Sequence, residues 1–506
     1  MRSELIEVRR RKLERLRALG VNPYPYRFAR TDTSEQLLRD FDSKMDGRSV
    51  ALAGRLMALR PMGKAVFAHL QDPSGRIQLY FKKDDLSARE WEVLELLDLG
   101  DIVGVRGTPM RTRTGEATVQ VREFELLCKT IRPLPSVKEK DGETFDAWSD
   151  TEARYRRRYL DLVLNPESRR AFEVRARLIS QLRSYLDTRG FLEVETPVLQ
   201  PIYGGAMARP FTTHHNALDM KLYLRIAEEL PLKKLLVGGI ERVYEIGRVF
   251  RNEGMDRNHN PEFTMLEFYW AYADYRDAMD LVEDMVRESV RSATGSTTVE
   301  YNGKTIDLGA PFTRRSMVEL IHDATGLDAL ASPESALRSH LTAAGLEVPT
   351  YAGRGQMIEM LFDLRVQGSL VQPTFVTDHP LAISPLAKVH RDRPGELVER
   401  FELFIDGREF GNSFSELNDP VDQRDRFEEQ ARLRDLGDEE AQVLDEDFLQ
   451  AIEHGMPPAA GVGIGIDRLV MLAAGASSIR DVLLFPHMRS EDAAGDSERD
   501  AGSDEA

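Results

Sequence analysis

Residues 250–275 read FRNEGMDRNHNPEFTMLEFYWAYADY, two strand-like arms around a polar loop. Side chains of a strand point alternately to opposite faces of its sheet. In the second arm this alternation predicts a core face made of Thr264, Leu266, Phe268 and Trp270. The other face comprises Phe263, Met265, Glu267 and Tyr269. The pattern therefore predicts a β-hairpin with one buried face and one face on which a carboxylate lies among aromatic rings.

The first arm and the loop add charged groups to the second of these faces. Alternation brings Arg251 and Glu253 to one side of the first arm, and the loop contributes Arg257 and His259, which are donors suited to phosphate. The structural alternative is a solvated sheet face with salt-bridged charges. Phe263 on the same face argues against that alternative, so we interpret the hairpin as one wall of a ligand site.

A second segment, GVGIGIDRLVMLA at 461–473, joins three alternating glycines to the start of a helix. Gly461, Gly463 and Gly465 remove the side chains from one strand face, and glycines inside a strand often mark the close approach of a ligand. A flat purine fits such a floor, with Arg468 stacked over it in a cation–π contact. The GxGxG spacing alone is weak evidence, and its value depends on the neighbouring motifs.

A third segment, RFELFIDGREFGNSFSELNDP at 400–420, repeats acidic residues in an otherwise apolar strand pair, at Glu402, Glu409 and Glu416. Buried carboxylates require a cation, which is a metal ion, an ammonium or an arginine. Mg²⁺ held by one or two carboxylates and substrate phosphates is the usual arrangement in phosphoryl chemistry. Alternation also groups Asn412 and Phe414 with Glu416.

Length and composition bound the remaining possibilities. A chain of 506 residues is too long for one core, so two or three domains are expected. Cys128 is the single cysteine, which excludes a disulfide framework and a multi-cysteine zinc site and favours a cytoplasmic location. No apolar run reaches the roughly 18 residues needed to span a membrane, so no membrane partner is expected.

The charge pattern leaves two readings of the N-terminus open. The net charge of −17 argues against a simple nucleic-acid binder, but the first 17 residues hold seven Lys or Arg against three Glu. This segment predicts a helix whose basic side chains face either solvent or RNA. The C-terminal residues RSEDAAGDSERDAGSDEA are acidic and lack large apolar side chains, which predicts a disordered end.

Between about 49 and 130, five short alternating segments surround one helical stretch, SAREWEVLELL, which follows the third of them. This is the layout of an OB-fold barrel, which binds oligonucleotides on its second and third strands. Phe67 and Gln78 fall on those strands, and an aromatic ring with an amide suits stacking and edge recognition of an unpaired base. Core packing of Phe67 is the alternative.

In their order along the chain, these motifs closely resemble the class II aminoacyl-tRNA synthetases. GFLEVETP at 190–197 corresponds to motif 1, FRNEG with its loop and EFTMLEFYWAYADY to motif 2, and GVGIGIDR to motif 3. An OB-fold before that domain points to the subgroup that charges lysine, aspartate and asparagine. Within it, GGAMARPF, LYLRIAEELPLKKLLVGG, HNPEF and GREFGNSFSELNDP resemble the members that charge lysine. The resemblance runs from about residue 3 to about residue 488.

The resemblance implies a multidomain α+β protein in which a six-stranded antiparallel sheet is flanked by helices and motif 1 forms a homodimer interface. The predicted parts are an N-terminal helical extension at 1–48, an OB-fold anticodon-binding domain at 49–135, a linker at 136–150, a class II catalytic domain at 151–488 and an acidic disordered tail at 489–506. The implied activity joins L-lysine to ATP as lysyl-adenylate, releases pyrophosphate, and transfers lysine to the 3′-hydroxyl of the terminal adenosine of lysine tRNA.

The resemblance also assigns roles to single residues. For ATP, Arg251 would hold the α-phosphate and the carboxylate of the substrate, and Glu253 would accept the adenine amino group. Phe263 and Arg468 would sandwich the ring. The remaining ATP contacts and the Mg²⁺ ligands would be His259 and Asn260 for the phosphate tail, Gly465 for the floor, and Glu402 and Glu409 for the metal. Arg251 and Arg468 are the predicted catalytic residues.

For the amino acid, the resemblance implies that Gly205 and Glu229 take the α-amine and that Glu267, Tyr269 and Glu416 surround the ε-ammonium. Arg251 would hold the carboxylate, and Asn412 and Phe414 would line the stem. An aspartate pocket would instead require an Arg or Lys in place of these acids. For the tRNA, the predicted anticodon contacts are Arg60, Phe67, Gln78 and Glu123.

Two other functions are compatible with parts of the pattern. A synthetase paralogue turned RNA-binding or regulatory protein would have lost catalytic groups, but Arg251, Arg468 and the pair Glu402 and Glu409 are all present. A ligase that attaches lysine to a protein would not need an OB-fold, and here the pattern of the barrel is complete.

Overall fold

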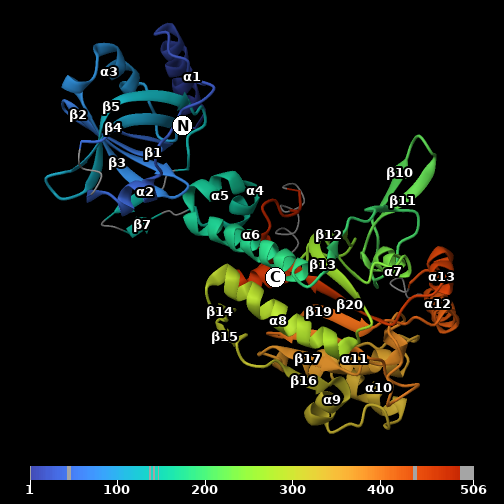
Figure 1. Cartoon of the computed structure of the whole chain (residues 1–506). Coiled ribbons are helices and arrows are strands. Elements are labelled where there is room, and N and C mark those ends of the chain that lie inside the picture. The colour runs from blue at the N-terminus through green and yellow to red at the C-terminus, as the bar shows by residue number, and fades with distance from the viewer. Residues whose placement is uncertain are drawn as a thin grey trace, which may run out of the picture. The chain divides into compact units, whose positions relative to one another are not determined.

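The computed structural model divides the chain into two compact units, Met1–Trp148 and Ser149–Ala506 (Figure 1). The structure describes residues 2–42, 47–135, 138–140, 143–145, 148–436 and 442–490. Most of the predicted acidic tail, residues 491–506, therefore lies outside the described residues. The division falls inside the segment predicted to be a linker.

The first unit is a closed five-stranded barrel with the strand order β1-β2-β3-β5-β4. Its strands are β1 (Val50–Met62), β2 (Ala65–Asp72), β3 (Gly75–Lys82), β4 (Ile102–Arg111) and β5 (Ala117–Cys128). Its helices are α1 (Arg2–Ala18), α2 (Ser34–Arg39) and α3 (Ala88–Glu95), the last lying between the third and fourth strands. This order confirms the OB-fold predicted from the alternating segments.

Alternation along the strands fills the barrel with apolar side chains. On β2 and β3 every second residue is buried, including Leu70 and Leu79. The helix α3 begins at a capping box in which Ser87 and Glu90 satisfy each other's backbone N–H groups, which explains where this helix starts. After the barrel, β6 (Lys138–Lys140) and β7 (Glu143–Phe145) pair within the segment predicted to be a linker.

The second unit is built on an eight-stranded sheet of order β16-β17-β18-β19-β20-β13-β12-β8. The strands are β8 (Leu192–Glu193), β12 (Arg242–Phe250), β13 (Glu262–Ala271), β16 (Thr313–Ser316), β17 (Thr374–Thr377), β18 (Arg400–Ile405), β19 (Arg408–Ser415) and β20 (Ala459–Gly465). The six central strands from β17 to β12 are antiparallel, as expected. The sheet is larger than the six strands expected, because β16 and β8 add a parallel strand at each edge.

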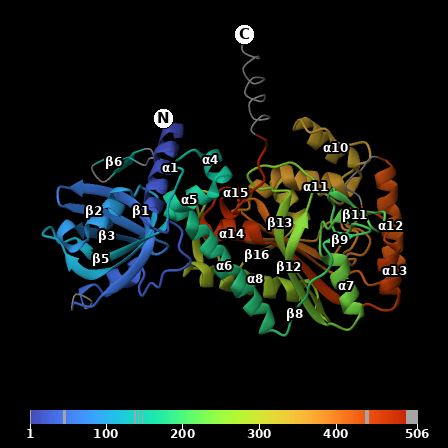
Figure 2. The ribbon, with the colours of Figure 1, turned by 90° about the horizontal axis from the view of Figure 1, so that it is seen from above.

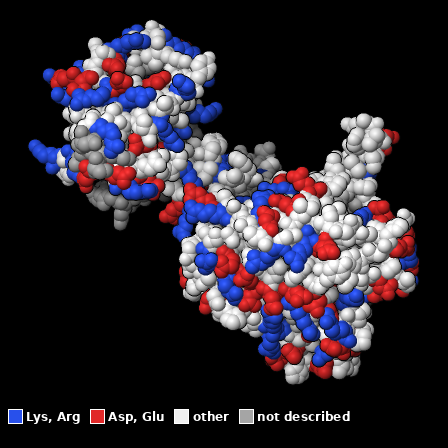
Figure 3. Space-filling view, viewed as in Figure 1, with Lys and Arg blue, Asp and Glu red and all other residues white. Residues whose placement is uncertain are grey.

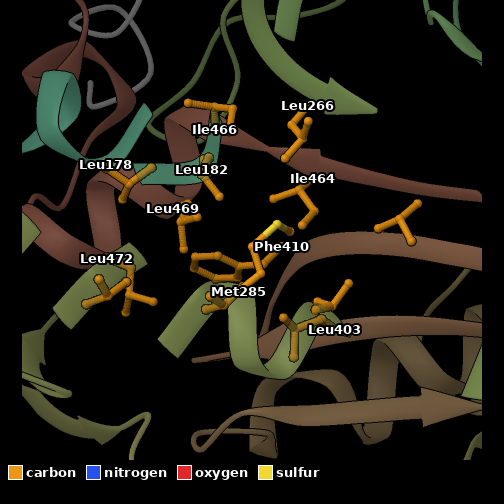
Figure 4. Close-up of a cluster of buried hydrophobic side chains, with 14 of the residues drawn as sticks. Leu178, Leu182, Leu266, Met285, Leu403, Phe410, Ile464, Ile466, Leu469 and Leu472 are labelled. Carbon is orange, nitrogen blue, oxygen red and sulfur yellow. The ribbon is translucent and has the colours of Figure 1, made fainter. Parts of the chain in front are cut away.

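One face of this sheet carries the main core. The helices α6 (Pro166–Asp187), α8 (Tyr275–Thr294) and α14 (Ile466–Ala474) lie against it (Figure 2). Leu178 and Leu182 of α6 meet Met285 of α8 and Leu266 and Ile464 of the sheet (Figure 4). Burial of such side chains stabilises each by about 1.5–3 kcal/mol relative to water. The core face predicted for the hairpin is confirmed, because Leu266 is fully buried in this cluster.

Shorter elements surround the rest of the sheet. The helices are α4 (Thr151–Arg156), α5 (Arg158–Leu164), α7 (Glu229–Val237), α9 (Met317–Thr325), α10 (Glu334–Ala343), α11 (Arg354–Arg365), α12 (Pro420–Asp435), α13 (Glu446–Glu453) and α15 (Ile479–Val482). The strands are β9 (Leu199–Gln200), β10 (Thr212–His215), β11 (Met220–Leu224), β14 (Thr298–Tyr301) and β15 (Lys304–Asp307). The helices α7, α12 and α13 enclose a smaller core with Phe427 and Phe448 on the far side of the sheet from α8.

Surface charge is mixed rather than segregated. Lys and Arg side chains alternate with Asp and Glu over the visible face of both units (Figure 3). On α1, Arg9 is buried and reaches Thr130 Oγ1 at 2.8 Å, whereas Arg10 and Arg11 are exposed. Within the described residues, no helix combines the length and the hydropathy that crossing a bilayer requires.

Candidate functional site

A cavity of about 500 Å³ opens on the face of the sheet opposite the main core. Its lining is drawn from β13, β18, β19 and β20, from the loops around 205–207 and 251–261, and from the segment 383–386. Most residues predicted for the site line it: Gly205, Glu229, Arg251, Glu253, His259, Asn260, Phe263, Glu267, Tyr269, Glu402, Glu409, Asn412, Phe414, Gly465 and Arg468. Glu416 lies buried behind this wall, and the four barrel residues belong to the other unit.

One end of the cavity is built from cations and aromatic rings. The guanidinium of Arg251 lies 5.2 Å from the ring centre of Phe263 and donates through Nε to the carbonyl of Ile226 at 3.4 Å. The carboxylates of Glu253 and Glu409 support its charge against the effect of burial, which lowers its pKa. In this ligand-free structure Arg251 thus covers one face of Phe263.

Arg468 is fixed by the adjacent strand and by the hairpin loop. Its Nη1 donates to the carbonyl oxygen of Glu409 at 2.6 Å, and its Nη2 lies 3.2 Å from Nε2 of His259. His259 is held in turn by Asp256, whose carboxylate lies 2.9 Å from Nδ1. This chain of contacts orients Arg468 and His259 toward the same part of the cavity.

Two carboxylates meet at this end from neighbouring strands. Glu402 accepts from Arg400 at 2.6 Å, and Glu409 Oε2 lies 3.6 Å from Arg468 Nη1. Burial and then the charge of Glu402 raise the pKa of Glu409. Mutual repulsion of two carboxylates is relieved by a divalent cation, so the donor set fits Mg²⁺ completed by phosphate oxygens. Among the described residues, no group of three or more His, Cys, Asp or Glu side chains is arranged to hold a metal ion.

The opposite end of the cavity is acidic. Glu267 is 3% exposed and accepts from the backbone N–H of Glu228 at 2.9 Å and from the hydroxyl of Tyr269 at 3.1 Å. Burial, followed by the charge of Glu229, raises the pKa of Glu267 to about 7. The pKa of Tyr269 is raised well above its usual value by burial and by the same group of carboxylates. The phenol therefore stays a hydrogen-bond donor at neutral pH.

Glu229 and Glu416 share one internal cation. Nζ of Lys233 lies 2.5 Å from Oε1 of Glu229 and also forms an ion pair with Glu416. Gly205 has a φ of +85°, and a Cβ there would come within 3.0 Å of Cβ of Glu229, so glycine allows this loop to approach the carboxylate.

Any side chain on Gly461, in the glycine-rich strand β20, would clash with residues that border the cavity. A Cβ on Gly461 would lie 2.0 Å from Oε1 of Glu416 and 2.4 Å from Cε1 of Tyr269. Gly463 is the paired neighbour of Glu267 on β13 and of Asn412 on β19. The absence of side chains on β20 is thus what lets the acidic groups of both neighbouring strands reach the cavity.

Several functional candidates were missed by reading the sequence. Arg400 opens β18 and donates to Oδ1 of Asn412 at 3.0 Å as well as to Glu402. Glu359 reaches the cavity from α11, and burial raises its pKa to about 7. Glu359 belongs to no segment with a recognisable local pattern. Arg400 begins the acidic segment 400–420, but nothing in that segment indicated that its side chain would reach the cavity. Lys233 lay inside a quoted motif, but nothing in that motif indicated that it would be buried.

The barrel brings the predicted base-contact residues to its outer face. Phe67 is half-buried rather than in the core, its ring lies 5.0 Å from that of Tyr80, and its strand partner on β1 is Arg60. Gln78 lies on the adjacent strand β3 and accepts from the hydroxyl of Thr118 at 2.7 Å. Glu123 is exposed on β5. The partial exposure of Phe67 places it outside the barrel core, and its role in base recognition stays a prediction.

Two family models match the chain. The model described as tRNA synthetases class II (D, K and N) covers residues 150–489. The model described as OB-fold nucleic acid binding domain covers residues 50–127, which corresponds to the five-stranded barrel.

Curated relatives match nearly the whole chain. A protein of Moorella thermoacetica is 54% identical over 489 residues, which cover 96% of this chain and 98% of the relative. A protein of Carboxydothermus hydrogenoformans is 50% identical, with 97% and 99% covered, and one of Pelotomaculum thermopropionicum is 52% identical, with 96% and 95% covered. All three relatives are named lysine–tRNA ligase.

Proposed function

The chain belongs to the class II tRNA synthetases of the aspartate, lysine and asparagine group, and we propose from this membership that it ligates L-lysine to tRNA at the expense of ATP. The observation that carries the choice of lysine is the acidic end of the cavity, where Glu267 and Glu229 line the wall and Glu416 lies directly behind it. A carboxylate substrate such as aspartate would be repelled there. ATP, lysine and tRNA are accordingly the substrates.

In the first step, the carboxylate of lysine attacks the α-phosphorus of ATP, and lysyl-adenylate and pyrophosphate form. We propose that Arg251 bridges the attacking carboxylate and the α-phosphate, where it stabilises the charge that develops in line. The contact of Arg251 with Phe263 and the interaction of its charge with that of Glu267 support this role. The chain supplies no nucleophile in this scheme, so the rate comes from positioning and electrostatics.

The remaining ATP contacts are proposals of the same kind. Glu253 accepts the amino group of adenine, and the ring lies over the floor at Gly465 between Phe263 and Arg468. His259 and Asn260 steady the phosphate tail; the contact of His259 with Arg468 supports a shared role. Glu402 and Glu409 hold Mg²⁺, which when bound neutralises phosphate charge.

For the amino acid, we propose that Gly205 and Glu229 bind the α-amine, that Glu267, Tyr269 and Glu416 bind the ε-ammonium, and that Asn412 and Phe414 line the stem. In the second step the 3′-hydroxyl of the terminal adenosine of the tRNA attacks the adenylate carbonyl. Motif 1 is the proposed homodimer contact, in support of which Leu192 in that segment and Leu199, two residues after it, are exposed apolar side chains. The cytosol is the proposed compartment, because tRNA is charged there.

The proposed function is tested by ATP–pyrophosphate exchange with the purified chain. We expect exchange to depend on lysine and to stay at background with aspartate or asparagine. Exchange with aspartate in place of lysine would overturn the substrate, and absence of exchange with all three would favour a non-catalytic paralogue. Subsequent transfer of labelled lysine to tRNA rather than to protein separates the tRNA ligase from a protein-lysine ligase.

A second prediction concerns the barrel, whose proposed anticodon contacts are Arg60, Phe67, Gln78 and Glu123. Phe67→Ala should lower kcat/KM for a tRNA with a UUU anticodon about tenfold, because stacking of one base contributes roughly 1–3 kcal/mol. Exchange without tRNA should not change, since the adenylate forms in the other unit. Tyr26→Ala, which removes a fully exposed ring outside the strands, is the matched control. Equal charging by the wild type and Phe67→Ala would refute the anticodon role.

A further inference from the structure

Lys233 is a charged side chain enclosed inside the wall of the cavity. It lies on α7, its side chain has no exposed surface, and its Nζ forms ion pairs with Glu229 and Glu416. The rings of Phe414 and Phe448 lie 5.2 and 6.0 Å from the ammonium. The next residue, Lys234, is partly exposed and pairs with Asp447 instead.

Burial of a charged side chain costs free energy, so the enclosed position of Lys233 calls for an explanation. Burial by itself would lower the pKa of Lys233, but Glu229 and Glu416 raise it above the usual value, so the side chain remains an ammonium. A buried ion pair is often no more stabilising than an apolar side chain of similar volume. Apolar side chains in place of the whole group of Lys233, Glu229 and Glu416 would therefore serve stability equally well, so the presence of all three charges points to a role in binding.

Lys233 engages only part of each carboxylate. Glu229 lines the cavity while its Oε1 faces the ammonium. Oε2 of Glu416 faces the ammonium, whereas its Oε1 has no hydrogen-bond partner in the described part of the chain and lies against Gly461 at the floor of the cavity. A buried acceptor oxygen without a donor costs free energy until a ligand supplies one. Oε1 of Glu416 is thus left for a ligand, and Glu229 reaches the cavity directly.

The acidic end of the cavity suits the two ammonium groups of lysine. Its carboxylates Glu229, Glu267 and Glu416 outnumber the ammonium of Lys233, which pairs with two of them. Without Lys233, Glu229 and Glu416 would each lose this ion pair, and buried carboxylates without a cation take up protons.

We propose that Lys233 is a positioning residue for substrate recognition: its ammonium holds the carboxylates of Glu229 and Glu416 in place so that the two groups meet the two amines of lysine. This inference rests on the proposed function and names a residue that acts through the two glutamates rather than on the substrate. It also predicts that the amino-acid end of the site, and not the ATP end, depends on Lys233.

The test is lysine-dependent ATP–pyrophosphate exchange by the full-length Lys233→Met variant. KM for lysine should rise at least tenfold while KM for ATP stays unchanged, because the ATP contacts lie on other elements. Lys234→Met, one residue away on the same helix, should behave like the wild type. In Lys233→Ala, methylammonium should enter the vacated space and restore part of the lysine affinity, whereas tetramethylammonium at the same concentration should not.

The outcomes separate this inference from the proposed function. A wild-type chain without lysine-dependent exchange would reject the function itself. A fully active wild type with an unchanged KM for lysine in Lys233→Met would reject only the role of Lys233. A parallel loss in kcat and both KM values together with a lower melting temperature, without rescue by methylammonium, would mark Lys233 as merely structural and also overturn the inference. If Lys233→Met does not fold, the rescue experiment on Lys233→Ala decides.

Discussion

Replacement of Arg251 by alanine should lower lysine-dependent ATP–pyrophosphate exchange about a thousandfold. Arg251 follows the end of β12, and its guanidinium contacts the carbonyl of Ile226 and the ring of Phe263. The guanidinium is therefore largely oriented before substrate binds. Removal of a single preorganised donor to developing negative charge typically costs a factor of about 10²–10³. Arg251 is proposed to contact both reacting partners, so the upper end of that range is expected.

The measurement is kcat/KM for exchange with lysine in excess, accompanied by a melting curve. Arg251→Lys keeps the charge but not the bidentate geometry of the guanidinium, so we expect its kcat/KM to lie between those of Arg251→Ala and the wild type. Arg248→Ala is the matched control, because Arg248 lies on the same strand with an exposed side chain that pairs with Glu262. Activity of Arg251→Ala within tenfold of the wild type would contradict the proposed role.

Strand alternation predicted the hairpin well because the two faces of the sheet differ in chemistry: one packs against the main core and the other lines the cavity. Leu266 and Phe268 lie in the core, and Glu267 and Tyr269 line the cavity, as parity requires. A strict period of two is informative where the two faces differ this strongly. The register of the hairpin, in which Val249 pairs with Phe263, then brings the end of β12 beside the start of the polar face.

Alternation fails where the backbone is irregular. By parity, Glu409 should lie on the opposite face from Asn412. The pairing of β18 with β19 shifts between Leu403 and Phe404, so that Phe410 turns into the core and Glu409 joins the cavity. A β-bulge of this kind inserts one residue and reverses parity beyond it, and the sequence carries no local sign of it. The resemblance to the family grouped Glu409 with the residues that line the cavity, whereas the strand period of two predicted the opposite face.

Contacts between distant segments were also beyond reach of the sequence. Arg400 and Glu359 reach the cavity only because β18 and α11 pack beside it. Lys233 and Lys234 illustrate the same limit on a helix: α7 is apolar on most of its surface, so composition does not say which of two adjacent lysines faces inward. The parallel edge strand β8 has two residues, too few for any periodicity to be detected.

Glu267→Gln should weaken lysine binding by roughly 10- to 100-fold and remove its pH dependence. Glu267 is buried, and its pKa is raised to about 7. The ε-ammonium of lysine stays protonated over this range, so binding improves as Glu267 ionises. In the wild type the dissociation constant for lysine should fall about tenfold between pH 6 and pH 8. Glutamine carries no charge and loses the charge-assisted hydrogen bond, which contributes about 1.5–3 kcal/mol.

The same titration has the opposite sign for the ligand-free protein. Because the folded pKa of Glu267 is raised above its unfolded value, its contribution to stability is fully present at acidic pH and is lost as pH rises through about 7. The melting temperature of the ligand-free wild type should therefore decline as pH rises toward about 7. The increase in melting temperature produced by saturating lysine should instead grow as pH rises. In Glu267→Gln the decline should be smaller, because the pKa of Glu359 is also raised to about 7, and the increase produced by lysine should no longer grow with pH. The dissociation constant for lysine should be measured by calorimetric titration in the absence of ATP, so that the ionisation of ATP does not contribute to the pH dependence.

Glu262→Gln is the matched control for this experiment, because Glu262 lies on the same strand but faces solvent beside Arg248. Glu229 and Glu416 also have raised pKa values, and both are paired with Lys233. Comparison of Glu267→Gln with the wild type therefore isolates the one carboxylate of the three that lacks a protein cation as its direct partner. A full pH dependence retained in Glu267→Gln would assign the titration to one of the other two, and a selective loss of ATP affinity would remove Glu267 from the lysine site.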